Sequence, residues 1–189
     1  MKGANDRVVL DACVLANHGL CDLFLRLAER PRLYSPKWSG QILSETHRTH
    51  LKLGWTASLA GHWQEEVQNH FPEAMVDEAA CLEPILANDP KDRHVLATAI
   101  RAGAATIVTF NLRDFEPDTL TPWHIHAVHP ADYLITLHTI GPDIVVAKLS
   151  DMARDRRSEP GAYLAKLSRS VPAFAQHIAR SVGWTLETG

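Results

Sequence analysis

Cysteine is scarce in this chain, and its few cysteines follow no disulfide or metal-binding pattern. Cys13, Cys21 and Cys81 are odd in number and lack metal-ligand spacing, which fits a reducing compartment better than a disulfide framework. No apolar run approaches the ~20 residues that span a bilayer. The charged N-terminus is followed at once by a strand-like segment and does not resemble a signal peptide. We therefore expect a cytoplasmic protein without a membrane-spanning segment.

The chain also lacks a strong positive charge. Its 189 residues carry a formal net charge of −3, so no bulk positive potential is available to coat nucleic acid. Any contact with phosphates has to be local. The candidate cations for such contacts are Lys37, Arg48, Arg93 and Arg113.

Several common catalytic and metal-binding motifs are missing as well. The chain has no glycine-rich dinucleotide loop and no phosphate-loop lysine. Its eleven histidines include His124, His126 and His129, but they form no Cys/His quartet and no HExxH motif. A structural zinc site is therefore disfavoured. Cys13 has no identifiable neighbouring base, which favours a small buried hydrophobic residue over a nucleophile.

What the chain does contain is an alternation of strand and helix patterns. With 46% hydrophobic residues, it can bury a substantial core. The patterns predict strands at 7–10, 33–34, 106–110 and 126–128, and helices at 15–28, 36–53, 55–71 and 90–102. This order is typical of an α/β fold with a mainly parallel central sheet. From residue 130 the pattern is helical, and its amphipathic faces predict an extension that packs on the domain or on a partner.

Two aspartates follow predicted strands and should share one edge of the sheet. Asp11 ends the strand at 7–10, and Asp114 follows the strand at 106–110 by a short loop. Open parallel sheets bind ligands beyond the carboxyl ends of their strands. The alternative for Asp11 is a helix N-cap or an Asx turn. A ligand-binding role is favoured because a carboxylate beside the core is otherwise poorly hydrated.

Glu45 is predicted to lie on the inward face of a helix. Trp38, Ile42, Glu45 and Thr49 follow the spacing of one helical face. The alternative is a glutamate at the edge of that stripe, paired with Arg48. Both interpretations stay open at this point.

Asp92 is predicted to occupy a similar position on a later helix. It shares one face with Val95, Leu96 and Ala99, whereas Asp89 stands at the cap. The alternative role for Asp92 is first-turn stabilisation, worth less than about 1 kcal/mol at an exposed site. Carboxylates that converge repel each other and usually require a divalent cation. Such a cation in a cleft suggests phosphodiester hydrolysis.

Four segments together resemble the PIN-domain family, in particular the VapC-type ribonuclease toxins of bacterial toxin–antitoxin pairs. They are Val-Val-Leu-Asp-Ala at 8–12, Glu45 on the second long helix, Asp-Pro-Lys-Asp-Arg-His-Val-Leu-Ala at 89–97, and Ile-Val-Thr-Phe-Asn-Leu-Arg-Asp-Phe at 107–115. The last two motifs are specific in sequence and spacing. The resemblance implies a PIN-like three-layer α/β/α domain at about residues 6–135. The helical extension at 136–189 carries no recognised motif.

The resemblance also implies the residues of the site. The implied catalytic and metal-binding residues are Asp11, Glu45, Asp92 and Asp114, with Mg²⁺ or Mn²⁺ as the cation. Thr109 is implied to hydrogen-bond near the first aspartate. Asn111 stands where relatives often carry Asn, Ser or Asp, and is implied to orient water or the loop. Because Asn supplies no negative charge, one metal ion and two remain alternatives.

The implied activity is hydrolytic endoribonuclease cleavage that leaves a 5′-phosphate and a 3′-hydroxyl. The implied partners are an RNA substrate, a cognate antitoxin protein and a second copy of the chain. Alternatives are a stand-alone RNA-processing nuclease and a non-catalytic PIN-fold protein-binding module. A Mg²⁺-dependent phosphatase is disfavoured because that class needs a second Asp two residues after the first, where this chain has Cys13.

Overall fold

The computed structural model describes residues 6–186, which form two compact units. The sheet unit comprises residues 6–17 and 35–129, and the helical unit comprises 18–34 and 130–186. Residues 18–34, which lie between the first two strands in sequence, therefore belong to the helical unit. The division into a PIN-like domain at residues 6–135 and a helical extension at 136–189 stays a prediction. No helix in the described range combines the length and apolar character needed to cross a bilayer.

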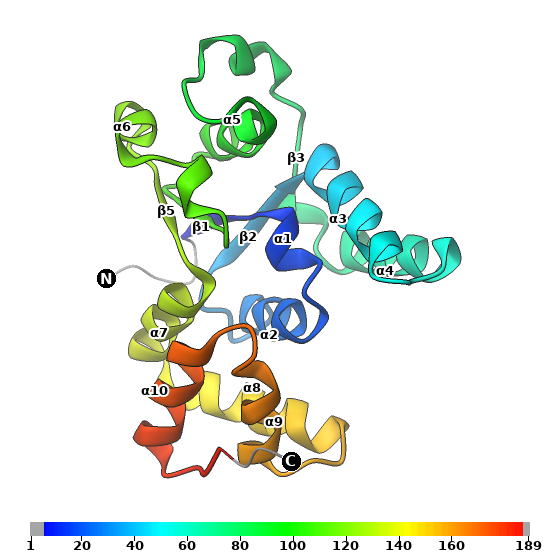
Figure 1. Ribbon diagram of the computed structural model, residues 1–189, viewed down its shortest axis with the longest axis vertical. Helices are drawn as coiled ribbons and strands as arrows, with labels where there is room; N and C mark the ends of the chain where they lie inside the picture. Colours follow the sequence, from blue (N-terminus) through cyan, green and yellow to red (C-terminus); the bar gives the residue numbers. More distant parts are fainter. Residues whose placement is uncertain (1–5, 187–189) are drawn as a thin grey trace. The chain divides into compact units, whose positions relative to one another are not determined.

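The sheet unit is built on five parallel strands in the order β3-β2-β1-β4-β5 (Figure 1). Their bounds are Arg7–Leu10 (β1), Ser35–Ser39 (β2), Met75–Val76 (β3), Thr106–Val108 (β4) and His126–Val128 (β5). The central strands β1 and β4 are buried along Val8–Leu10 and Thr106–Val108. A parallel sheet covered on its faces requires such continuous apolar runs, so the predicted α/β class is confirmed.

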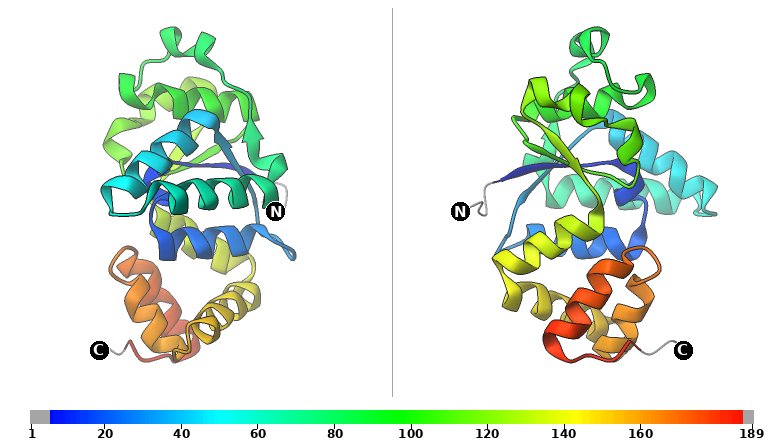
Figure 2. Two further views of the ribbon diagram at one scale, coloured as in Figure 1. Left: turned by 90° about the vertical axis from the view of Figure 1, so that its right-hand side faces the viewer. Right: turned by 60° about the vertical axis from the view of Figure 1, so that its left-hand side comes forward.

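Helices flank this sheet and carry the loops of its carboxyl edge. Their bounds are Ala12–Leu15 (α1), Gly40–Lys52 (α3), Ala57–His70 (α4), Arg93–Ala102 (α5) and Pro117–Leu120 (α6). α5 packs against β1, β2 and β4, and α3 packs against α4 (Figures 1 and 2). α5 ends at Gly103 in the left-handed conformation (φ 62°), where glycine is favoured because it has no Cβ. This confirms the predicted end of the helix.

The predicted helix start at Pro36 is wrong. Residues Ser35–Ser39 form β2, and α3 begins at Gly40 with the Ser39 hydroxyl accepting a hydrogen bond from the Ile42 amide at 3.3 Å. Ser35-Pro36 resembles a cap followed by a first helical residue, but proline is also tolerated where a strand has one neighbour. β3 pairs only with Trp38 and Ser39, so Pro36 lies where β2 is paired with β1 alone.

The later start also shifts the inward face of α3. Trp38 belongs to β2, so the predicted stripe of Trp38, Ile42, Glu45 and Thr49 does not exist as a helical face. The buried residues of α3 are Ile42, Leu43, Thr46 and His50. Glu45 lies half-buried at the edge of that stripe. The alternative position considered for Glu45 is therefore the observed one.

The helical unit joins α2 to the C-terminal helices. Its helices are His18–Ala28 (α2), Pro130–Ile140 (α7), Pro142–Asp155 (α8), Pro160–Leu167 (α9) and Pro172–Val182 (α10). Each of the last four begins at a proline, the residue that best tolerates the first turn of a helix. α8 contacts α2, α7 and α9, and α10 contacts α7 and α9 (Figure 2). The predicted helical extension is thus present, and α2 belongs to the same compact unit.

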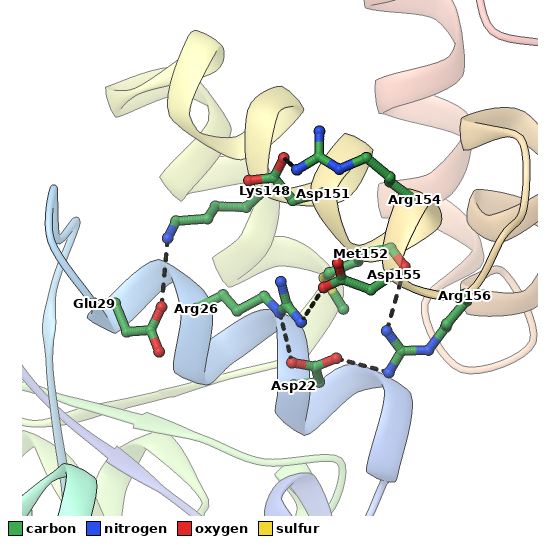
Figure 3. A network of polar contacts seen from close by, with 9 residues as sticks. All are labelled: Asp22, Arg26, Glu29, Lys148, Asp151, Met152, Arg154, Asp155 and Arg156. Atoms are coloured by element: carbon green, nitrogen blue, oxygen red, sulfur yellow. Dashed lines mark hydrogen bonds and ion pairs between the residues drawn. The ribbon is translucent and has the colours of Figure 1, made fainter.

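A network of ion pairs links α2 to α8 within this unit (Figure 3). Arg26 contacts Asp22 and Asp155, both at 2.8 Å, and Arg156 contacts Asp22 at 2.7 Å. Burial alone would raise the pKa of Asp22, but the hydrogen bonds and charges of Arg26 and Arg156 outweigh it, and the pKa is lowered. The Asp22 carboxylate is therefore stabilised in its charged form by two guanidinium groups.

We expect Asp22→Asn to lower the free energy of unfolding of the helical unit by about 1–3 kcal/mol at pH 7, because two charge-assisted hydrogen bonds lose their charged acceptor. A group with a lowered folded pKa stabilises the fold above its unfolded pKa and loses that effect as the pH falls through the folded value. The difference from the parent chain should therefore shrink below about pH 4. Urea unfolding at both pH values measures it.

Asp151→Asn is the matched control for this network. Asp151 pairs with Arg154 at 2.6 Å, but the two side chains are 41% and 75% exposed, so the loss should stay within about 0.5 kcal/mol. Equal losses in the two variants would show that the α2–α8 network contributes nothing beyond an exposed pair.

Candidate active site at the carboxyl edge of the sheet

Asp11 lies where β1 ends and α1 begins. Its amide donates to the Val108 carbonyl of the neighbouring strand β4 at 3.1 Å, so the parallel ladder fixes its position. The residue is only 4% exposed, and its side chain makes no capping hydrogen bond to α1. The N-cap alternative is therefore excluded for the side chain. A nearly buried carboxylate is left at the edge where parallel sheets bind ligands.

Two donors hold one oxygen of the Asp11 carboxylate. The Thr109 hydroxyl donates to Asp11 Oδ2 at 2.6 Å, and the Cys13 thiol donates to the same oxygen at 3.1 Å. Burial and the Asp11 charge raise the pKa of Cys13 to about 12, which keeps the thiol protonated as a donor. No hydrogen bond from the described residues reaches Oδ1. Asp11 thus has one fixed oxygen and one oxygen available to a ligand.

Asp92 lies close enough to Asp11 and Asp114 for their charges to affect its pKa. Burial, followed by the charges of Asp11 and Asp114, raises the pKa of Asp92 to about 6, while His94 acts in the opposite direction. Asp92 ends a 3₁₀ turn before α5, and Asp114 ends another after β4. The Asp89 amide donates to the Asp114 carbonyl at 3.4 Å and joins the two loops. Asp92 therefore lies within electrostatic range of two of the other predicted acids, and the assignment of all four to one site stays a prediction.

Glu45, the fourth acid, lies beside two basic side chains in this structure. Its Oε2 lies 3.2 Å from His94 Nε2, and its Oε1 lies 3.5 Å from an Arg48 guanidinium nitrogen. Burial opposes the charge on His94, but the hydrogen bond and charge of Glu45 and the charges of Asp92 and Asp11 raise its pKa. Glu45 thus adjoins the cluster through His94, and its role as a metal ligand stays a prediction.

His94 is the site residue that the sequence analysis missed. It is 3% exposed and lies between Glu45 and the aspartates, two residues after Asp92. Its signal was present, because a histidine inside the 89–97 motif begins the buried face of α5. Sequence spacing does not identify it, because His94 belongs to no zinc motif and its contact with Glu45 joins residues far apart in the chain.

Of the predicted cations, Arg113 lies with Asn111 on the exposed loop after β4, Arg48 is exposed on α3, and Lys37 and Arg93 are half-buried on β2 and α5. The Arg113 side chain is 89% exposed and contacts Asp114 at 3.8 Å, and the Arg48 side chain is 63% exposed. Arg93 donates to the Asn88 carbonyl at 3.4 Å. The Asn111 amide donates to the Thr109 hydroxyl at 3.0 Å, so the loop helps to orient the residue that holds Asp11. Lys37 donates instead to the Glu73 carbonyl.

The donor set of this cluster fits a hard divalent cation. The converging groups are carboxylates, the ligands that Mg²⁺ and Mn²⁺ favour. A bound cation could be coordinated by Oδ1 of Asp11, which accepts no hydrogen bond from the described residues. It would also offset the charges of Asp11 and Asp114, which together with burial raise the pKa of Asp92. Within residues 6–186, no group of three or more His, Cys, Asp or Glu side chains is arranged so that it could hold a metal ion by itself. Mg²⁺ commonly uses one or two carboxylates together with waters, so a full protein cage is not required.

Comparison with known proteins decides the family. Residues 7–113 match the family described as PIN domain, which is more than half of the chain. The chain belongs to the PIN-domain family. The matched segment of this PIN domain contains Asp11, Glu45 and Asp92 and ends one residue before Asp114, so the place of Asp114 rests on the geometry described above.

The PIN domain is also similar to a curated protein of Mycobacterium tuberculosis (strain ATCC 25618 / H37Rv) named "Putative ribonuclease VapC50". The two are 40% identical over 96 residues, which are 49% of this chain and 57% of the relative. The chain thus aligns with just over half the length of that relative. No solved structure matches the chain significantly. The expected resemblance to VapC-type PIN-domain proteins is confirmed.

Proposed function

We propose that this PIN domain is a Mg²⁺- or Mn²⁺-dependent endoribonuclease of the cytoplasm. The observation that carries the proposal is the nearly buried Asp11 carboxylate at the carboxyl edge of the sheet, one oxygen of which is held by Thr109 and Cys13, with Asp92 close enough for burial and then the charges of Asp11 and Asp114 to raise its pKa to about 6. Mutual repulsion of this kind is typical of a site that gathers carboxylates for a cation. The printed name of the M. tuberculosis relative supports RNA as the substrate.

In this proposal the three aspartates hold the cation, with Glu45 as a further ligand or as a base held by His94. A bound cation supplies an activated water and neutralises charge on the scissile phosphate. Thr109 and Cys13 fix Asp11 Oδ2 and so present Oδ1 to the site. Hydrolysis leaves a 5′-phosphate and a 3′-hydroxyl. No nucleophilic side chain is required, in keeping with the protonated state of Cys13.

The proposed substrate is unpaired RNA. Local cations have to meet the phosphates because the net charge of the whole chain is −3. Exposed side chains on the segments that carry the acids supply them, namely Arg48 on α3, and Lys91 and Arg113 on the two 3₁₀ turns. The deep, narrow groove of duplex RNA is closed to side chains, whereas loops and single strands can enter an edge site.

We expect removal of divalent cations to abolish cleavage of RNA by the purified chain. EDTA should reduce cleavage of a single-stranded RNA at least ~100-fold, and added Mg²⁺ or Mn²⁺ should restore it, because the aspartates alone cannot activate water. Gel analysis with end-group mapping measures the rate and the 5′-phosphate. Cleavage that persists in EDTA, or products with cyclic phosphate ends, would contradict the metal-dependent mechanism.

We further propose a toxin role, with a cognate antitoxin protein as partner and self-association as a dimer. The similarity to a VapC-type protein supports this step. Expression of the chain should arrest bacterial growth, and co-expression of a small neighbouring DNA-binding protein should relieve the arrest. Active RNA cleavage without growth arrest would favour a stand-alone RNA-processing nuclease. Absence of cleavage together with protein binding would favour the non-catalytic module.

A further inference from the structure

One aromatic side chain beside the acidic cluster is left partly open to solvent. Residues 106–109 at the end of β4 are all buried, but Phe110 is half-buried and the loop 111–113 that follows is exposed. Five residues later Phe115, in the same loop region, is only 2% exposed. The fold can therefore bury a phenylalanine here, and Phe110 is the one that stays accessible at the catalytic edge.

The Phe110 ring is held in a defined place. It forms an edge-to-face pair with His129, with ring centroids 5.1 Å apart and an interplanar angle of 81°. A T-shaped pair covers at most one face of either ring. Because Phe110 follows β4 and His129 follows β5, the neighbouring ends of two paired strands position both rings. The pair thus forms a positioned aromatic surface, and Phe110 within it stays partly open to solvent.

The backbone of Phe110 is connected to the Asp11 carboxylate by two hydrogen bonds. Its amide donates to Cys13 Sγ at 3.4 Å, and the Cys13 thiol donates to Asp11 Oδ2 at 3.1 Å. The preceding residue is Thr109, whose hydroxyl also holds Asp11. An RNA phosphate bound at the aspartates would therefore have its own or its neighbouring base within reach of the Phe110 ring.

We propose that Phe110, supported by His129, stacks the nucleobase beside the scissile phosphate and so selects unpaired RNA. Every base has a π-face, so stacking on an aromatic ring is tolerant of sequence but requires a base that is free of its helix. The inference rests on the proposed ribonuclease function and adds the group that recognises the base. Phe110 is thus a substrate-binding residue, in addition to the acids that hold the cation.

Binding of a short single-stranded RNA tests the proposal through three variants. Phe110→Ala and Phe110→Leu should weaken binding about 5–100-fold, because both lose the π-face. Phe110→Tyr should bind within about 2-fold of the parent chain, because it keeps the ring. Leucine retains the apolar bulk, so a residue that only packs would tolerate Leu as well as Tyr. Circular dichroism of each variant checks that the fold is kept.

An RNA with one abasic nucleotide next to the cleavage position isolates the stacked base. The missing base should weaken binding to the parent chain about as much as Phe110→Ala does. In the Phe110→Ala variant, the same missing base should weaken binding little further. Additive losses, or full binding by the Leu variant, would overturn the proposal. In cleavage assays KM should rise while kcat changes less.

Binding and cleavage assays together distinguish failure of the ribonuclease function from failure of base stacking by Phe110. If the parent chain binds RNA with a Phe110-dependent affinity but does not cleave it, the ribonuclease function is overturned, and only the role of Phe110 in stacking a base of bound RNA is kept. If it cleaves RNA and the Phe110 variants behave like the parent, only the stacking inference fails. If the chain binds no RNA, both are overturned.

Discussion

Replacing Asp11 with asparagine should lower the rate of RNA cleavage by about 10³-fold or more while the protein stays folded. Asparagine keeps the size of the side chain and can still accept hydrogen bonds from Thr109 and Cys13 at one oxygen. It loses the anionic oxygen that the cation requires, and with it the activation of water. Initial rates at saturating Mn²⁺, with thermal unfolding as the check on folding, measure the effect.

Asp118→Asn is the control for the Asp11 experiment. Asp118 is an exposed acid in the first turn of α6, in the same sheet unit, and has no contact with the cluster. Its replacement removes the same charge from the chain and should change the rate less than 2-fold. If Asp11→Asn cleaves RNA as well as Asp118→Asn does, the site assigned here is not the catalytic one.

Asp92→Asn should separate activity from stability. The variant should lose cleavage by about 10²-fold or more, because a cation ligand is removed. In the absence of metal it should nevertheless melt higher than the parent chain, by at most about 2–4 °C, because Asp92 is only half-buried and solvent screening leaves no more than ~1 kcal/mol of the unfavourable charge energy. The reason is that burial and the charges of Asp11 and Asp114 disfavour the Asp92 carboxylate, and the amide carries no charge.

The pH dependence gives the sign of this effect. In the folded chain, burial and the charges of Asp11 and Asp114 raise the pKa of Asp92 from its ordinary value of 3.8 to about 6. The stability gained by holding its proton is fully present below the unfolded value and is lost as the pH rises through the folded one. The advantage of Asp92→Asn should therefore appear above about pH 6 and vanish near pH 4. A variant that melts lower than the parent at pH 8 without metal would contradict the repulsion.

The sequence predicted the sheet because its strands are buried on both faces and read as continuous apolar runs. The same logic placed Asp11 and Asp114 at one edge, and the helical phase of Val95, Leu96 and Ala99 placed Asp92 near them. Those positions depend on local periodicity and strand polarity, which a sequence displays directly. The sequence is therefore most informative about β1, β4 and α5.

The errors fall where tertiary pairing decided between two local options. Ser35-Pro36 fits a helix start as well as a strand, and its pairing with β1 selected the strand. That choice moved Glu45 to the edge of the buried stripe, where His94 and Arg48 bind it. Neither the contact between Glu45 and His94 nor the hydrogen bond from Thr109 to Asp11 can be read from spacing, because each joins segments about 50 to 100 residues apart.

The helical unit is assembled from both ends of the chain, and this has a consequence for synthesis on the ribosome. Asp22 on α2 binds Arg156, a partner 134 residues later, and Arg26 binds Asp155. Contacts of such separation form only after most of the chain has been made. α2 therefore leaves the ribosome early, but its contacts with α8 form only after residue 156 has been made. A chain that stops near residue 135 would expose the apolar side of α2 and would be bound by chaperones or degraded by proteases.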